Sequence, residues 1–139
     1  MQEIEVTFNI EVKEDFVDML VNWSDWLGTG YCGYWAFGVV QDPSIGWLFA
    51  DCDEDGYCSD ELKAQFAEAE RIWRKEHGEP HDGPCETLPK RFHSMDKNNV
   101  LEVIRQGVKR YGPDFQEQYD SESLDVAVQM TFLHEVVYG

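Results

Sequence analysis

The 139-residue chain contains no apolar run near the roughly 20 residues that a membrane-spanning helix needs. Its first residues, MQEIEVTFNIEV, include neither the basic nor the apolar segment of a secretory signal peptide. No linker, internal repeat or low-complexity tract interrupts the sequence. These absences predict a cytoplasmic protein without a membrane partner, folded as a single domain over residues 1–139.

The sequence also lacks the local signatures of common catalytic sites. It has no Gly-x-Ser-x-Gly, no His-Glu-x-x-His and no glycine-rich phosphate-binding loop. Among 28 Asp and Glu residues, no two stand out as a catalytic pair. We therefore expect a protein that is not an enzyme.

Basic residues are scarce at both ends of the chain. Residues 1–60 carry 13 acidic side chains and one basic side chain, and residues 113–139 carry six acidic and none basic. Residues 61–112 are balanced, with nine acidic and ten basic side chains. The net charge of −17 is therefore segregated, which argues against a merely solvated acidic surface. Long acidic tracts repel nucleic acid and anionic lipid and attract basic partners.

The basic middle segment has two interpretations. Its side chains either neutralise the acidic ends of the same molecule or contact something else; they include Arg71, Arg74, Lys75, Arg105, Lys109 and Arg110.

Hydrophobic periodicity predicts an α+β fold. Alternation over residues 3–12 indicates a strand, and Gly-rich, aromatic and β-branched residues around QDPS indicate a hairpin over 34–50. Spacings of three and four predict helices over 13–28, 59–78, 96–112 and 121–139, with a turn or short helix over 113–120 and a loop over 79–95. We expect a small antiparallel sheet, made of the N-terminal strand and the hairpin, packed with about four helices.

One face of the first predicted helix carries carboxylates at helical spacing. Asp15, Asp18 and Asp25 form this stripe, and Glu11 and Glu14 precede it. Neighbours on such a face lie about 5–6 Å apart, comparable to successive phosphates along a nucleic-acid strand. The acidic loop that follows the hairpin adds further carboxylates to the predicted contact surface: Asp51, Asp53, Glu54 and Asp55.

The same loop, DCDEDGYCSDEL, has the first half of an EF-hand calcium loop. Asp51, Asp53 and Asp55 occupy alternate positions, and Gly56 stands at the sixth position, where the turn needs glycine. The twelfth position, which should supply a bidentate glutamate, is Leu62. An ordinary acidic turn is the alternative, and calcium through Asp51, Asp53 and Asp55 stays open as the metal hypothesis.

A zinc site is the other metal hypothesis, through Cys52, Cys58, His77 and His81, with Cys85 able to replace a histidine. The gaps of five and eighteen residues do not match the close spacing of zinc knuckles. We favour no cofactor, with Cys32, Cys52, Cys58 and Cys85 as reduced thiols.

The C-terminal segment LDVAVQMTFLHEVVYG resembles the ends of small proteins carried by phages and mobile elements. The matching positions are Asp125, Gln129, Glu135, Tyr138 and Gly139, with His134 in place of a glycine. Small acidic phage proteins are similar as a class to anti-CRISPR and anti-restriction inhibitors. This resemblance implies an inhibitor that binds the basic surface of a host nucleic-acid-binding defence complex in the host cytoplasm, by imitating nucleic acid rather than by binding it. A calcium- or zinc-binding module is the alternative.

Overall fold

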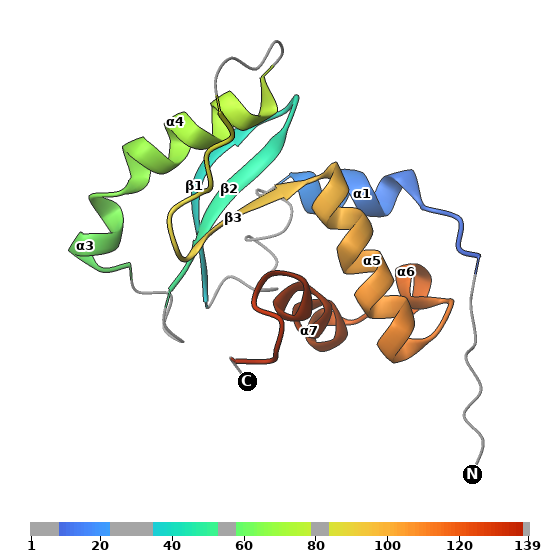
Figure 1. The fold of residues 1–139 in the computed structure, drawn as a ribbon. Helices are drawn as coiled ribbons and strands as arrows, with labels where there is room; N and C mark the ends of the chain where they lie inside the picture. Colours follow the sequence, from blue (N-terminus) through green and yellow to red (C-terminus); the bar gives the residue numbers. More distant parts are fainter. Residues whose placement is uncertain (1–8, 23–34, 53–57, 79–83, 138–139) are drawn as a thin grey trace.

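The computed structural model describes residues 9–22, 35–52, 58–78 and 84–137 (Figure 1). Six helices and three strands form these parts of the chain, so the predicted α+β class is confirmed. In chain order they are α1 (Glu14–Val21), β1 (Ala36–Asp42), β2 (Gly46–Asp51), α3 (Asp60–Lys63), α4 (Phe66–His77), β3 (Phe92–Asp96), α5 (Lys97–Tyr111), α6 (Phe115–Gln118) and α7 (Ser121–Phe132).

The sheet is antiparallel, with β2 in the centre between β1 and β3. The predicted hairpin is confirmed: β1 turns into β2 at Asp42, whose carboxylate accepts hydrogen bonds from the amide and hydroxyl of Ser44. Gly46 begins β2 with φ +136°, and a Cβ there would lie 2.0 Å from the carbonyl oxygen of Met95. Glycine is therefore required where β3 passes closest to the hairpin.

Helices cover both faces of the sheet, as Figure 1 shows for α4 on one side and for α1, α5 and α7 on the other. Successive side chains of β2 point to opposite faces. Trp47 and Phe49 belong to the apolar cluster with α1, α5 and α7, whereas Leu48 and Ala50 pack with α3 and α4. The central strand is thus buried on both faces.

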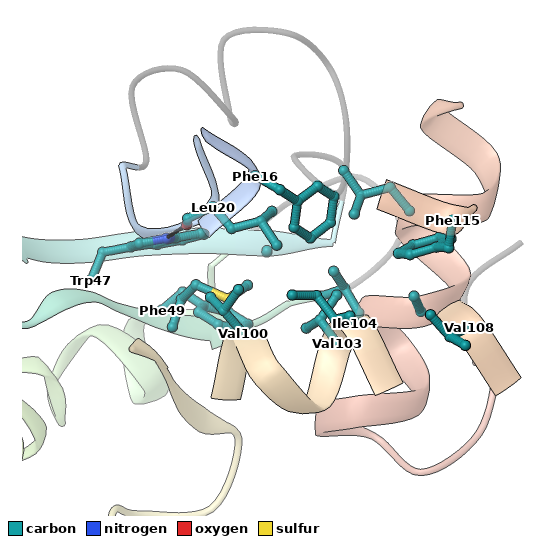
Figure 2. Close-up of a cluster of buried hydrophobic side chains, with 14 of the residues drawn as sticks. Phe16, Leu20, Trp47, Phe49, Val100, Val103, Ile104, Val108 and Phe115 are labelled. Atoms are coloured by element: carbon teal, nitrogen blue, oxygen red, sulfur yellow. Dashed lines mark hydrogen bonds between the residues drawn. The ribbon is translucent and has the colours of Figure 1, made fainter. Parts of the chain in front are cut away.

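The larger cluster holds α1 and α6 against α5. Figure 2 shows Phe16 and Leu20 of α1 pointing toward Val100, Val103 and Ile104 of α5. The Trp47 indole N–H donates to the carbonyl of Leu20 over 2.8 Å, which joins α1 to the sheet.

Close packing of α6 on α5 depends on Gly107. A Cβ at this position would lie 2.2 Å from the ring of Phe115. Because that ring is buried at the start of α6, it has little room to move aside.

The predicted helix over 59–78 begins as expected but is broken. Ser59 caps α3 by accepting a hydrogen bond from the amide of Leu62 (3.2 Å). At Gln65 the backbone amide bonds to the carbonyl of Leu62, and the side-chain amide takes the carbonyl of Glu61 instead. This exchange interrupts the regular hydrogen-bond pattern and separates α3 from α4.

Two strand predictions differ from the structure. Residues 9–12 form no strand, and residues 1–8 lie outside the described parts. The carbonyl of Glu11 and the amide of Lys13 bond instead to the side chain of Gln116. The third strand is Phe92–Asp96, which was expected to be the end of a loop; its alternation is only five residues long, and pairing with β2 stabilises it.

The last helix ends earlier than predicted, at Phe132. His134 has φ +64°, which helical residues do not adopt, and the amide of Val137 donates to the side-chain oxygen of Gln129. This bond holds the residues that follow α7 against the side of that helix. The short helix α6 and the helix α5 agree with the predicted segments.

Candidate protein-binding surface

Several basic side chains of the middle segment pair with acids of the same segment. Arg71 bonds to Glu68 and Glu86, and Lys75 also bonds to Glu86. Hydrogen bonds from Arg71 and Lys75 lower the pKa of the Glu86 carboxyl to about 2. The charges of Arg71 and Lys75 are thus neutralised by carboxylates of the same segment.

Other arginines of the middle segment pair either within the segment or with the acidic N-terminal block. Arg74 bridges Glu70 of its own helix and Asp42 at the end of β1, and Arg105 pairs with Glu102 on α5. Among the ion pairs of the described residues, none joins this segment to a carboxylate of α1. The ion pairs of the described residues therefore support the first interpretation in part, since some basic side chains of the middle neutralise acidic side chains of the same molecule.

The carboxylates of α1 lie on its exposed side. We name Glu11, Glu14, Asp15 and Asp18 the acidic stripe; all four are exposed, and none takes part in an ion pair within the described parts of the chain. Lys13 lies among them but pairs with Glu117 of α6 at 3.5 Å. The opposite side of α1 buries Phe16 and Leu20, so the helix is attached through its apolar face and presents its acidic face to solvent.

Hydrogen bonds and aromatic contacts to α6 hold the backbone that carries the acidic stripe. The side chain of Gln116 is buried; its amide donates to the carbonyl of Glu11 over 2.9 Å, and its oxygen accepts from the amide of Lys13 over 2.8 Å. Phe16 contacts the rings of Phe115 and Tyr119 edge-on, at centroid separations of 5.9 and 5.3 Å. The chain leading into α1 is thereby held against α6, so the backbone that carries the carboxylates is in place before any partner binds.

A second acidic area lies where α5, α6 and α7 meet. A cleft of about 430 Å³ opens there, lined by Tyr111, Asp114, Phe115, Gln118, Tyr119, Asp120, Glu122 and Ser123. Asp120 already caps α7, because its carboxylate accepts from the amide of Ser123 over 2.8 Å, and this bond lowers the pKa of the carboxyl. Part of the charge in this cleft therefore serves the fold.

Asp51 does not belong to the exposed surface. It ends β2 almost fully buried, with Arg91 Nε 3.1 Å from one carboxylate oxygen and His93 Nε2 2.7 Å from the other. Burial opposes ionisation, but the hydrogen bonds from His93 and Arg91 outweigh it and hold the pKa below its ordinary value. We therefore remove Asp51 from the predicted contact surface. The other predicted contact residues, Asp25, Asp53, Glu54 and Asp55, lie outside the described residues.

The calcium hypothesis loses its first ligand in this arrangement. Both carboxylate oxygens of Asp51 are already engaged by protein groups, which a calcium ion would have to displace. Asp53 and Asp55 lie outside the described residues, so calcium binding by this loop stays a prediction.

The candidate zinc ligands are also engaged or separated. Cys52 and Cys58 are buried, and burial together with the neighbouring Cys58 thiol raises the pKa of Cys52 to about 12, which disfavours the thiolate that binds metal. His77 places Nδ1 2.7 Å from the Trp73 carbonyl and Nε2 2.8 Å from Asp96. Cys85 is exposed, whereas Cys32 and His81 lie outside the described residues. Within the described ranges no three metal-binding side chains come together.

One group unites the residue types of a hydrolase triad, and sequence reasoning missed it. Ser94 and His77 both bond to the same carboxylate oxygen of Asp96, at 3.0 and 2.8 Å. The aspartate thus stands between serine and histidine, whereas a catalytic triad needs histidine in the middle. Ser94 is buried and accepts a hydrogen bond from the Trp73 indole over 2.8 Å. The group therefore joins α4 to β3 and does not form a nucleophile.

The C-terminal pattern has a structural role in this chain. Asp125 accepts hydrogen bonds from the indole of Trp35 (2.8 Å) and from the amide of Gln129 (3.1 Å). Gln129 is fully buried, and its oxygen holds the amide of Val137. The four-residue spacing of Asp125 and Gln129 places both on one side of α7. These two residues are better explained by buried hydrogen bonding than by contact with a partner.

No protein-family model matches the sequence, and no curated protein or solved structure is significantly similar to it. Among the described helices, none combines the length and the apolar character needed to cross a membrane.

Proposed function

We propose that this protein is a non-enzymatic inhibitor that binds the basic, nucleic-acid-binding surface of a host defence complex through its acidic stripe. The single observation that carries the proposal is that Glu11, Glu14, Asp15 and Asp18 share one exposed face without an ion pair to the described residues. Lys13, which lies among them, pairs with Glu117 of α6 instead. The C-terminal resemblance to phage-borne proteins supports a defence complex as the partner.

The spacing of the stripe suits a surface that normally accepts phosphates. Residues three or four apart on a helix face lie about 5–6 Å from one another, and Gln116 orders the start of this series. A backbone already held in place costs less conformational entropy on binding than a free segment would. Association should be fast at low ionic strength and should weaken as salt screens the charges.

A charge-reversal experiment tests the proposal. Glu14→Lys with Asp15→Lys should abolish capture of a nucleic-acid-binding complex from host lysate at low salt, because it converts the centre of the stripe to the opposite sign. Asp60→Lys with Glu61→Lys is the matched control, since it makes the same change in net charge in the first turn of α3. Circular dichroism verifies that both variants fold.

The comparison between the two variants gives the outcome. We expect capture by the wild type and the α3 variant, and loss by the α1 variant. Equal loss in both variants would show that net charge, not the acidic stripe, governs binding, and would contradict the proposal. Recovery of the same partner at high salt by the α1 variant would contradict it too.

A further inference from the structure

An apolar groove runs beside the acidic stripe, between α1 and α5. It has a volume of about 380 Å³ and is lined by Val12, Val17 and Leu101 together with Glu14, Asp18 and Lys97. Val12 and Leu101 are 41% and 40% exposed and line the same groove, so they form one shared apolar surface. The groove thus combines exposed hydrophobic surface with two carboxylates of the stripe.

The apolar exposure has a simple structural origin. The buried side of α1 uses Phe16 and Leu20, and the buried side of α5 uses Val100, Val103 and Ile104 (Figure 2). Leu101 is next to this buried face in the helical turn and remains largely in contact with solvent.

A second hollow also borders Val12. It measures about 400 Å³ and is lined by Glu11, Lys13, Glu14 and Asp15 in addition to Val12. The exposed valine therefore lies next to carboxylates of the stripe and to Lys13. A partner that pairs with these carboxylates also covers the apolar side chains between them.

We propose that the groove receives one apolar side chain from a basic, amphipathic peptide segment of the partner, whose flanking Lys or Arg residues pair with Glu14 and Asp18. This inference rests on the proposed function and specifies the partner segment. Charge complementarity favours such an occupant, because carboxylates line the groove on the α1 side. Lys97 at the start of α5 repels a segment that is cationic throughout, whereas an apolar side chain beside it meets no such repulsion.

Two other occupants fit the charges poorly. A second copy of the chain would bring another net charge of −17 to an already acidic rim. Residues 1–8 of the same chain contain Glu3 and Glu5 and no basic side chain, so they would also place like charges against Glu14 and Asp18.

Two fluorescein-labelled synthetic peptides test the inference by anisotropy. They share the same lysines and differ at one central position, which is leucine in one and serine in the other. Burying the leucine removes its apolar surface from water, whereas a serine at that position gains nothing comparable. We expect the full-length protein to bind the leucine peptide at least about tenfold more tightly, and Leu101→Ser to remove most of this difference without weakening the serine peptide. Val136→Ser is the matched control, because it removes another exposed apolar side chain.

The outcomes separate the groove from the stripe. If both peptides bind equally, or if the leucine preference persists in Leu101→Ser, the groove inference is overturned. If both then lose binding in Glu14→Lys with Asp15→Lys, the proposed function survives without the groove. If neither peptide binds, both proposals fail. Sedimentation of the wild type and of Leu101→Ser tests whether a second copy of the chain occupies the groove. A dimer that forms in the wild type and is lost in the variant would show this and would overturn the inference.

Discussion

Helices α1 and α4 cover opposite faces of the same sheet, but the basic side chains of α4 form ion pairs, whereas the carboxylates of α1 form none with the described residues. On α4, Arg71, Arg74 and Lys75 each bond to carboxylates within reach. On α1, Glu14 and Asp15 have no ion pair to the described residues. Both helices bury an apolar face, through Phe16 and Leu20 in α1 and through Ala69, Ile72 and Trp73 in α4.

The difference shows that surface charge alone does not indicate a binding site. Exposed ion pairs like those of α4 contribute little to stability. Because their opposite charges cancel, they produce no net electrostatic attraction for a charged partner. The carboxylates of α1 lie close to one another and form no ion pair with the described residues, so the fold keeps them without that compensation. Such an uncompensated group is the better candidate for a contact surface.

Removing the support of the stripe should have the largest effect. Gln116→Ala leaves the Glu11 carbonyl and the Lys13 amide without their bonds, and we expect a loss of about 1–3 kcal/mol in the free energy of unfolding. Urea denaturation measures this loss, and hydrogen exchange should show weaker protection of the Lys13 amide. Gln118→Ala, an exposed neighbour, is the control; equal effects of the two variants would contradict the role of Gln116.

Acid should weaken the ion-paired part of the molecule. The pKa of Asp51 is lowered in the folded state, so its contribution is present above its ordinary value of 3.8 and is lost as pH falls through the lower folded value. Stability should therefore drop below about pH 4, and less steeply in Asp51→Asn. Urea titrations across this range give the slope. Glu86, whose pKa is about 2, contributes to the same window, so Glu86→Gln serves as the second variant. A slope unchanged in Asp51→Asn would refute the assignment.

Changing one carboxylate of the stripe should affect stability least and in the opposite direction. Asp18 follows Glu14 by four residues, so Asp18→Lys replaces a repulsion with an attraction. We expect a gain of about 0.2–0.5 kcal/mol at low salt, together with weaker partner binding. Thermal unfolding at low and high salt measures the gain, which salt should remove. Loss of stability would show that Asp18 serves the fold.

Elements whose signals are local could be predicted from the sequence. The hairpin, the Ser59 cap and α5 follow from turn residues, a capping side chain and helical spacing over many residues. The strand β3 could not be predicted, because five residues beside a helix carry too little alternation and depend on pairing with β2. The N-terminal alternation was wrong over residues 9–12 for the converse reason, since Gln116 takes the backbone groups that a strand would use.

Of the candidate site, too, only part could be predicted from the sequence. The periodicity of α1 was sufficient to place Asp15 and Asp18 on one exposed face. The sequence could not separate Asp51 from them, because its partners Arg91 and His93 lie about 40 residues away in the chain. Nor could it identify the groove, which forms only where α1 and α5 come together.

The sequence by itself determined the α+β class and the segregation of acidic from basic residues, because composition and short-range periodicity are local properties of the chain. Only the tertiary structure decided which carboxylates stay unpaired. Ion pairing depends on distances across the fold, and the fold brings Arg74 to Asp42, Arg91 to Asp51 and Lys13 to Glu117. The acidic stripe on α1 is what these long-range contacts leave exposed.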